Sequence, residues 1–138
     1  MLAFSTDTLA NGGLGFRRAE VRTAYLVYYA TADFQQPTDT LRQPTGRVAV
    51  GSTKPVLVIY YGAGYPPQFA VAGYSQPSAP KSFRLVVPAA TRQYDIGNII
   101  LEESPGKSRC DGYRITRREA TVNGQRVDGI SNPPELTK

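Results

Sequence analysis

A basic run in the last third of the chain has the residue types and spacing that could bind anions. Guanidinium and ammonium groups bind phosphate and carboxylate oxygens, and the formal net charge of +5 suits a polyanion partner. The alternative is a charged strand that protects the edge of a sheet against pairing with another chain. Lys107 belongs to the run, and its candidate polyanion contacts are Arg109, Arg114, Arg117 and Arg118.

The carboxylates show no spacing typical of a catalytic pair. Glu102 and Glu103 are the densest pair, but they fall at the end of a predicted strand, where adjacent side chains point to opposite faces. The aspartates lie near turn residues, where Asp commonly bonds its own backbone. An enzyme built on carboxylates would have to bring Asp33, Asp95 and Glu102 into one pocket.

Histidine is absent and cysteine occurs once, as Cys110. Without histidine the chain cannot form a histidine-based triad, a histidine metal site or an imidazole proton shuttle. A single cysteine cannot form an internal disulfide or a cysteine zinc site, and no imidazole is present to activate its thiol. We therefore expect no enzyme activity, no metal and no cofactor, while the sequence leaves the cellular compartment open.

Tyrosine is the abundant aromatic residue, with 9 copies and no tryptophan. In the pairs Tyr28-Tyr29 and Tyr60-Tyr61, one ring should face inward and the other outward on a strand. An exposed phenol ring suits a protein interface because it combines apolar area with a polar tip, although plain sheet packing is the alternative. The predicted protein interface comprises Tyr28, Tyr60, Tyr65, Phe4 and Phe16.

Short apolar segments, rich in β-branched and aromatic residues and bounded by Gly, Pro or Ser, predict strands. A helix is the alternative for residues 20–30, and the segments 56–61 and 83–87 lack alternation, so we expect them in the middle of sheets. Asn123-Gly124 is the pair that a type I′ hairpin turn requires, because both positions need a positive φ. The expected strands are residues 20–30, 47–50, 56–61, 69–72, 83–87, 96–101, 113–116 and 120–127.

These elements predict an all-β fold, a single β-sandwich of seven or eight short strands in a chain of 138 residues. We place the sandwich at residues 19–127, between an irregular N-terminal arm (1–18) and an irregular C-terminal tail (128–138). The two ends either pack on their own domain or dock on neighbouring subunits. No apolar run approaches about 18 residues, so we expect a soluble chain with no membrane span. Residues 1–4 are too short for the apolar region of a signal peptide, so we expect none in this sequence, with a leader already removed as the alternative.

Residues 46–103 carry a family resemblance. The central strand PVLVIYY leads into Gly64-Tyr65 and a further strand at residues 69–72, and the closing strand DIGNIIL holds a glycine between apolar residues. This order resembles the transthyretin-like, carboxypeptidase regulatory-like β-sandwich. The resemblance implies a non-catalytic seven-stranded module, often appended to enzymes or envelope proteins, that serves folding, adhesion or assembly.

We expect a non-catalytic structural or accessory subunit of a larger assembly, such as an envelope complex or a virion. It would form a homo- or hetero-oligomer with other protein subunits through its aromatic strands and terminal arms. The alternative is a polyanion- or nucleic-acid-binding β module that uses the basic C-terminal hairpin. If the N-terminal arm binds neighbours, removing residues 1–16 should abolish assembly and leave the melting temperature nearly unchanged.

Overall fold

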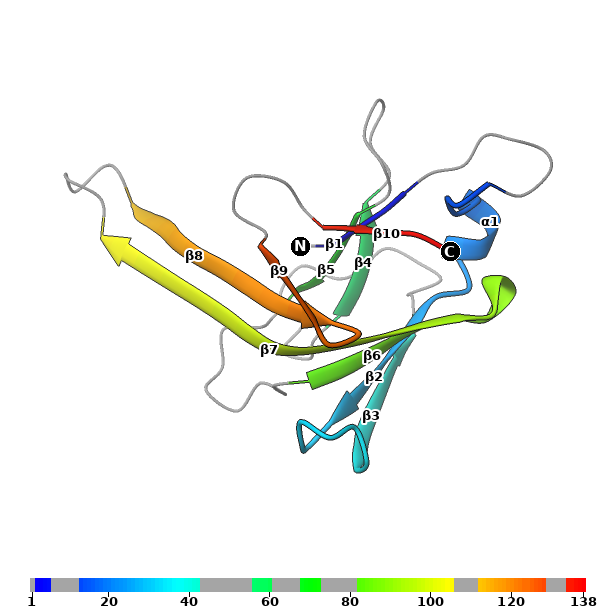
Figure 1. The fold of residues 1–138 in the computed structure, drawn as a ribbon, viewed down its shortest axis with the longest axis horizontal. Helices are drawn as coiled ribbons and strands as arrows, with labels where there is room; N and C mark the ends of the chain where they lie inside the picture. The colour runs from blue at the N-terminus through cyan, green and yellow to red at the C-terminus, as the bar shows by residue number, and fades with distance from the viewer. Residues whose placement is uncertain are drawn as a thin grey trace.

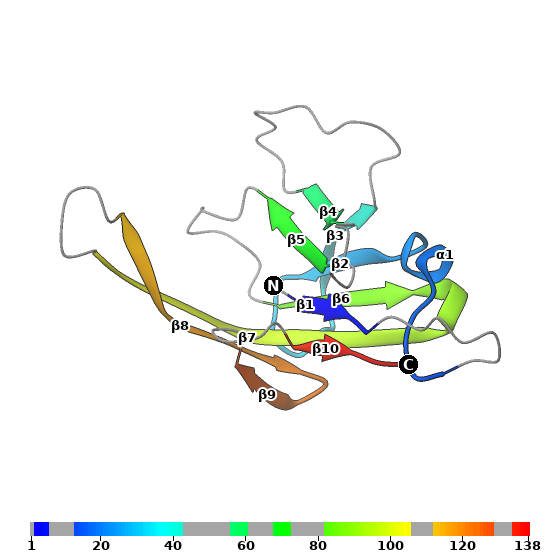
Figure 2. The same cartoon turned by 90° about the horizontal axis from the view of Figure 1, so that it is seen from above.

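The computed structural model describes residues 2–5, 13–42, 56–60, 68–72, 82–105, 112–128 and 134–138, and the fold is given for these residues. They form two sheets, which confirms the expected all-β class (Figure 1). The small sheet lies above the large one in Figure 1, and Figure 2 shows β1 and β10 drawn over β6 and β7. The arrangement is therefore β-sandwich-like.

The large sheet has six antiparallel strands in the order β3-β2-β6-β7-β8-β9. The strand expected over residues 20–30 is shorter than predicted, because its first residues belong to a short helix, α1 (Arg18–Val21), and the turn after it. The 3-10 turn η1 (Pro88–Ala90) joins β6 to β7. The strands are β2 (Tyr25–Tyr29), β3 (Pro37–Arg42), β6 (Ser82–Val87), β7 (Arg92–Pro105), β8 (Tyr113–Val122) and β9 (Gln125–Asp128).

The small sheet has four strands in the order β10-β1-β5-β4. β1 runs parallel to β10 and antiparallel to β5, and β5 pairs antiparallel with β4. Among the strands described, β4 is the last in this order, although we expected its segment in the middle of a sheet. The strands are β1 (Leu2–Phe4), β4 (Val56–Tyr60), β5 (Gln68–Ala72) and β10 (Glu135–Leu136).

Both ends of the chain form strands of the small sheet, so the prediction of irregular arms was wrong at β1 and β10. The backbone N–H of Ala3 donates to the oxygen of Pro134 at 3.0 Å, and that of Ser5 donates to the oxygen of Leu136 at 2.9 Å. Leu2, Phe4 and Leu136 bury their side chains in the core. Strands of two or three residues are too short to produce a periodic sequence pattern, which is why sequence reasoning missed them.

The core contains side chains from the inner face of the large sheet, from both ends of the chain and from the α1 region. Phe16 packs edge-on against Phe4, with ring centroids 5.2 Å apart, and against Tyr94 at 6.3 Å. The Tyr94 hydroxyl donates a hydrogen bond to the backbone oxygen of Thr137. The core residues are Leu2, Phe4, Phe16, Val21, Ala24, Leu26, Tyr28, Phe83, Leu85, Val87, Tyr94, Ile96 and Leu136.

An ion pair also ties the last residue to α1. Lys138 Nζ lies 2.9 Å from a carboxylate oxygen of Glu20, and its backbone N–H donates to the oxygen of Leu14 at 2.7 Å. The backbone N–H of Arg17 donates to the same Glu20 carboxylate at 2.7 Å. The hydrogen bond from Arg17, followed by that from Lys138, holds the pKa of Glu20 below its usual value.

The predicted turn between β8 and β9 is confirmed, because Asn123 has φ 50° and Gly124 has φ 78°. Segment 47–50, which is one of the expected strands, lies outside the described residues. β6 is central in the order of the large sheet as expected, but its side chains alternate: Leu85 is buried whereas Arg84 and Val86 are half-buried. β3 was not predicted, since its mostly exposed residues show no apolar alternation.

Candidate interaction surface

β7 and β8 continue beyond the strands that flank them. Among the described residues, β6 pairs with β7 from Arg92 to Ile96, and β9 pairs with β8 from Glu119 to Val122. Beyond these positions, residues 101–105 of β7 and residues 113–118 of β8 pair with each other. We call these two stretches the β7–β8 ribbon, and Figures 1 and 2 both show it extending away from the body.

Two irregularities shape the pairing of β7 with β8. From Gly97 to Ile100 on β7 the partner advances only from Thr121 to Glu119, so β7 has one extra residue. Asn98 lies in this bulge with φ 47°, a conformation that Asn tolerates better than most residues. Bulges bend strands and increase their twist. This bulge comes directly before residue 101, where the ribbon leaves the rest of the sheet.

The second irregularity lies inside the ribbon. Glu102 and Glu103 are adjacent on β7, but they face Arg117 and Ile115 on β8, so Thr116 is the extra residue. The Thr116 hydroxyl donates to the backbone oxygen of Glu102 at 3.2 Å. This hydrogen bond ties the bulge on β8 back to β7.

A ladder of opposite charges crosses three strands at the base of the ribbon. Arg117 Nη1 lies 3.0 Å from Glu102 Oε1, and Arg117 Nε lies 2.9 Å from Glu119 Oε1. The second oxygen of Glu119 accepts from Arg117 Nη2 at 3.1 Å, which makes this pair bidentate. Arg126 on β9 completes the ladder, with Nη2 2.6 Å from Glu119 Oε1.

The ladder shifts the pKa values of its members in the direction that keeps them charged. Hydrogen bonds from Arg117 and then from Arg126 lower the pKa of Glu119 from 4.5 to about 2. Hydrogen bonds to Glu119 and then to Glu102 raise the pKa of Arg117. Because Arg117 and Glu119 are only partly buried, the ladder contributes to alignment of the strands more than to global stability.

The four candidate polyanion contacts do not form one free basic cluster. Arg117 is paired with two carboxylates, whereas the half-buried Arg118 takes part in none of the ion pairs between described residues. Arg114 belongs to β8 by its backbone, and its side chain lies outside the description. Arg109 lies outside the described residues. Sequence reasoning found the basic strand, with Glu119 as a residue that dilutes its charge, but it missed the pairing of Arg117 with Glu102 across β7 and β8.

Three residues of the predicted protein interface are core residues of this chain. Phe4, Phe16 and Tyr28 are only 0%, 1% and 2% exposed, so the prediction that they contact neighbours from the surface was wrong. The aromatic content predicted interface contacts, but the same rings fill the space between the two sheets. Tyr60 lies on β4 with its side chain outside the description, and Tyr65 lies outside the described residues.

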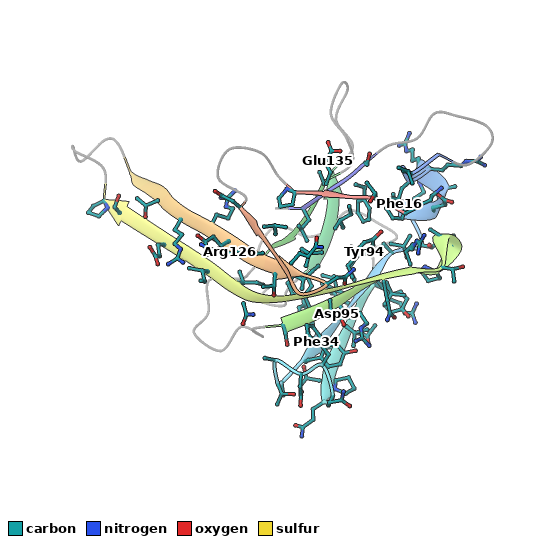
Figure 3. The ribbon with its side chains drawn as sticks, in the orientation of Figure 1. Phe16, Phe34, Tyr94, Asp95, Arg126 and Glu135 are labelled. Carbon is teal, nitrogen blue, oxygen red and sulfur yellow. The ribbon has the colours of Figure 1, made fainter. Side chains whose placement is uncertain are left out.

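The expectation of one exposed ring in Tyr28-Tyr29 also failed, because Tyr29 is covered on the outer face of the large sheet. The Phe34 ring lies 5.4 Å from that of Tyr29, and the guanidinium of Arg84 lies 5.5 Å from its centroid. Figure 3 shows Phe34 and Asp95 on the side of β7 opposite to Tyr94 and Phe16. The hairpin after β2 therefore folds an aromatic residue back over the sheet.

The carboxylates considered for an enzyme are each held by different partners. Asp95 binds Arg84 in two hydrogen bonds of 2.5 and 2.9 Å, and Glu102 pairs with Arg117. Asp33 accepts hydrogen bonds from the Thr31 hydroxyl and from the backbone of Gln35, and these bonds lower its pKa. The three acids are thus not brought together as one acid–base site.

Within the part of the chain described, no three His, Cys, Asp or Glu residues are grouped in a way that could hold a metal ion. The described helices include none with the length and apolar character needed to cross a membrane. No protein-family model, no curated protein and no solved structure matches the chain. The transthyretin-like resemblance of residues 46–103 therefore stays a prediction.

Proposed function

We propose that the protein is a non-catalytic subunit of a larger protein assembly and that it contacts a neighbour through the β7–β8 ribbon. The observation that carries the proposal is the extension of β7 and β8 past both flanking strands. An isolated two-stranded hairpin is marginal in water because it buries little apolar surface. An element of this kind, held on a packed two-sheet body, is suited to binding rather than to supporting the core.

The charge ladder supports the same role for the ribbon. Arg117 links Glu102 on β7 to Glu119 on β8, and Arg126 extends the link to β9. Holding the strands in register before binding reduces the conformational entropy that a partner has to overcome. Residues 1–16 are less suited to docking than the ribbon, because Phe4 and Phe16 are buried in the chain's own core.

The polyanion alternative receives less support. Of its described side chains, Arg117 is neutralised by two glutamates, which leaves Arg118 as a single half-buried cation. Binding of nucleic acid depends on several phosphate contacts made together, since each contact contributes a salt-dependent increment. A DNA duplex is therefore the probe that tests this alternative in a binding experiment.

The test compares the native mass of the intact protein with that of a variant with a shortened ribbon. In the variant, an asparagine-glycine turn replaces residues 101–118 and joins Ile100 to Glu119, which are direct partners in the ladder. We expect the intact protein, when it is isolated from its source, to have a native mass well above 15.0 kDa because it is part of a complex. We expect the variant to lose that complex while its melting temperature changes by no more than about 4 °C.

Two results would contradict the proposal. A mass of 15.0 kDa for the intact protein, both purified alone and as isolated from its source, would exclude a stable assembly. A variant that folds and still enters the complex would exclude the ribbon as the contact. A control with Leu14→Ala, which alters an exposed side chain away from the ribbon, should retain the complex.

A further inference from the structure

The outer edge of β8 lacks a strand partner along half its length in the part of the chain described. β7 pairs with one side of β8 from Val122 to Tyr113, whereas β9 pairs with the other side only from Val122 to Glu119. At residues 113–118, no described strand pairs with this outer side. A row of backbone donors and acceptors at a sheet edge can accept an added strand.

We infer that this open edge, residues 113–118 of β8, binds an extended acidic segment of a partner protein, which adds to the large sheet as a further strand. The inference rests on the proposed assembly function and names the chemistry of the neighbour. Backbone hydrogen bonds would supply affinity, and cross-strand side-chain pairs would supply selectivity.

The charges of the edge strand support an acidic partner. Residues 113–118 read YRITRR, with three arginines and no acid, whereas residues 101–105 of β7 read LEESP, with two acids and no base. An added strand would lie about 4.8 Å from β8 and about 10 Å from β7. Because Arg117 is already paired with Glu102 and Glu119, the added strand would meet the charges of Arg114 and Arg118, and salt weakens the influence of the β7 carboxylates at about 10 Å.

The side of β8 that faces β7 already pairs with an acidic strand of the same chain. The strand already paired there, β7, has Glu102 directly opposite Arg117, with the ion pair at 3.0 Å. Opposite charges at facing positions stabilise antiparallel pairs, and like charges destabilise them. β8 thus already pairs with an acidic strand on one side, and Arg118 of the same strand takes part in none of the ion pairs between described residues.

A second copy of the same edge does not fit this chemistry. In an antiparallel pair of two β8 edges, the stretch containing Arg114, Arg117 and Arg118 would face itself and bring guanidinium groups together. This like-charge contact disfavours self-association at the edge. The occupant is therefore a different, acidic strand.

The first experiment measures binding of labelled peptides to the full chain by fluorescence anisotropy. The main probe is a peptide of about twelve residues that alternates glutamate with valine, a length that covers the open edge with margin. A second probe has the same sequence with alternate backbone nitrogens methylated, which keeps the charge and removes hydrogen-bond donors. A third replaces glutamate by lysine, and a fourth is a DNA duplex.

We expect saturable binding of the glutamate peptide only. Equal binding of the methylated peptide would show that charge attraction alone is at work and would overturn the inference of strand addition. Binding of the duplex without the glutamate peptide, with affinity falling steeply between about 0.05 and 0.2 M salt, would assign the edge to nucleic acid instead. Binding of neither probe would also overturn the inference.

The second experiment reverses charge on the edge. We expect the double variant Arg114→Glu with Arg118→Glu to weaken binding of the glutamate peptide about tenfold or more, because two favourable cross-strand pairs become repulsive. The matched control is Arg22→Glu with Arg92→Glu, which makes the same change in net charge at exposed positions away from the ribbon. An equal loss in both variants would indicate a general charge effect and contradict the inference.

These outcomes separate the inference from the function on which it rests. If the native protein lies in a complex but the charge-reversed variant enters it normally and no peptide binds, the acidic-strand inference is wrong and the assembly role remains. If the native protein is a 15.0 kDa monomer, the assembly role is wrong whatever the peptides do.

Discussion

The strand β1 and the β7–β8 ribbon are both short stretches of β-structure, and their side chains are used in opposite ways. β1 has strands on both sides, and none of its residues is more than 7% exposed. In the ribbon each strand has only the other as a described partner, and Arg117 is 38% exposed within a charge ladder. The comparison shows that a position near the end of a chain does not by itself place a segment on the surface.

The difference follows from side-chain chemistry. Leu2 and Phe4 gain stability from leaving water, so a three-residue strand is held by the core around it. The ribbon is rich in charge, and exposed ion pairs contribute little to stability because water and salt screen them. We therefore expect substitutions in β1 to act on folding, and substitutions in the ribbon to act on binding.

The largest effect is expected for Phe4→Ala. Phe4 is fully buried and packs edge-on against Phe16, so removing its ring should lower the free energy of unfolding by about 3–5 kcal/mol. Denaturant unfolding followed by circular dichroism measures the change. Leu14→Ala is the matched control, because Leu14 is 75% exposed and should change stability by less than about 0.5 kcal/mol. Equal midpoints for the two variants would break the comparison, since β1 would then not be part of the core.

A smaller effect is expected for Tyr94→Phe, which tests how the other end of the chain is anchored. The variant loses the hydrogen bond from the Tyr94 hydroxyl to Thr137, at a cost of about 1 kcal/mol near neutral pH. Burial raises the pKa of Tyr94 above its usual 10.0, so the folded state favours the neutral phenol. The stabilisation is complete below pH 10 and is lost as pH rises through the folded pKa.

The deficit of Tyr94→Phe should therefore shrink in alkaline solution. Unfolding midpoints of both proteins across this pH range measure it, because the variant has no phenol at this position to ionise. A deficit that stays constant above pH 10 would mean that the Tyr94 phenol ionises equally in both states and is not shielded by the fold.

The smallest effect on stability is expected for Glu119→Gln in the ribbon ladder. The pKa of Glu119 is lowered from 4.5 to about 2, so its contribution is present above about pH 4.5 and is lost as pH falls toward 2. The variant should unfold at a slightly lower midpoint than the native protein at pH 7 and converge with it as pH falls toward 2, which gives it the flatter acid dependence. Glu135→Gln, at an exposed glutamate on β10, is the control. A steep acid dependence retained in Glu119→Gln would show that the ladder does not hold this carboxylate in solution.

Sequence reasoning located most long apolar strands and the turn at Asn123-Gly124, because β-branched side chains and a demand for positive φ act within a few residues. It missed β1, β10 and β3, which are too short or too polar for a pattern. It also ended the strand that begins near Ile96 at residue 101, whereas β7 continues to Pro105. The polar end of β7 is a strand because β8 pairs with it, and pairing between residues 8 to 15 positions apart leaves no local signal.

The candidate site was predictable in part for the same reason. A run of arginines is visible in one dimension, so the basic strand was found. The pairing of Arg117 with Glu102, and the exclusion of Phe4 and Phe16 from the surface, depend on which segments meet in space.

Composition and local preference by themselves determined the all-β class, the absence of histidine chemistry and the hairpin turn, since each depends on residue type or on immediate neighbours. Only the tertiary structure decided that the aromatic residues near the N-terminus fill a core and that no described strand pairs with the outer side of residues 113–118. Burial and ion pairing are set by contacts between distant segments, and the same ring or guanidinium serves either role until its neighbours are in place.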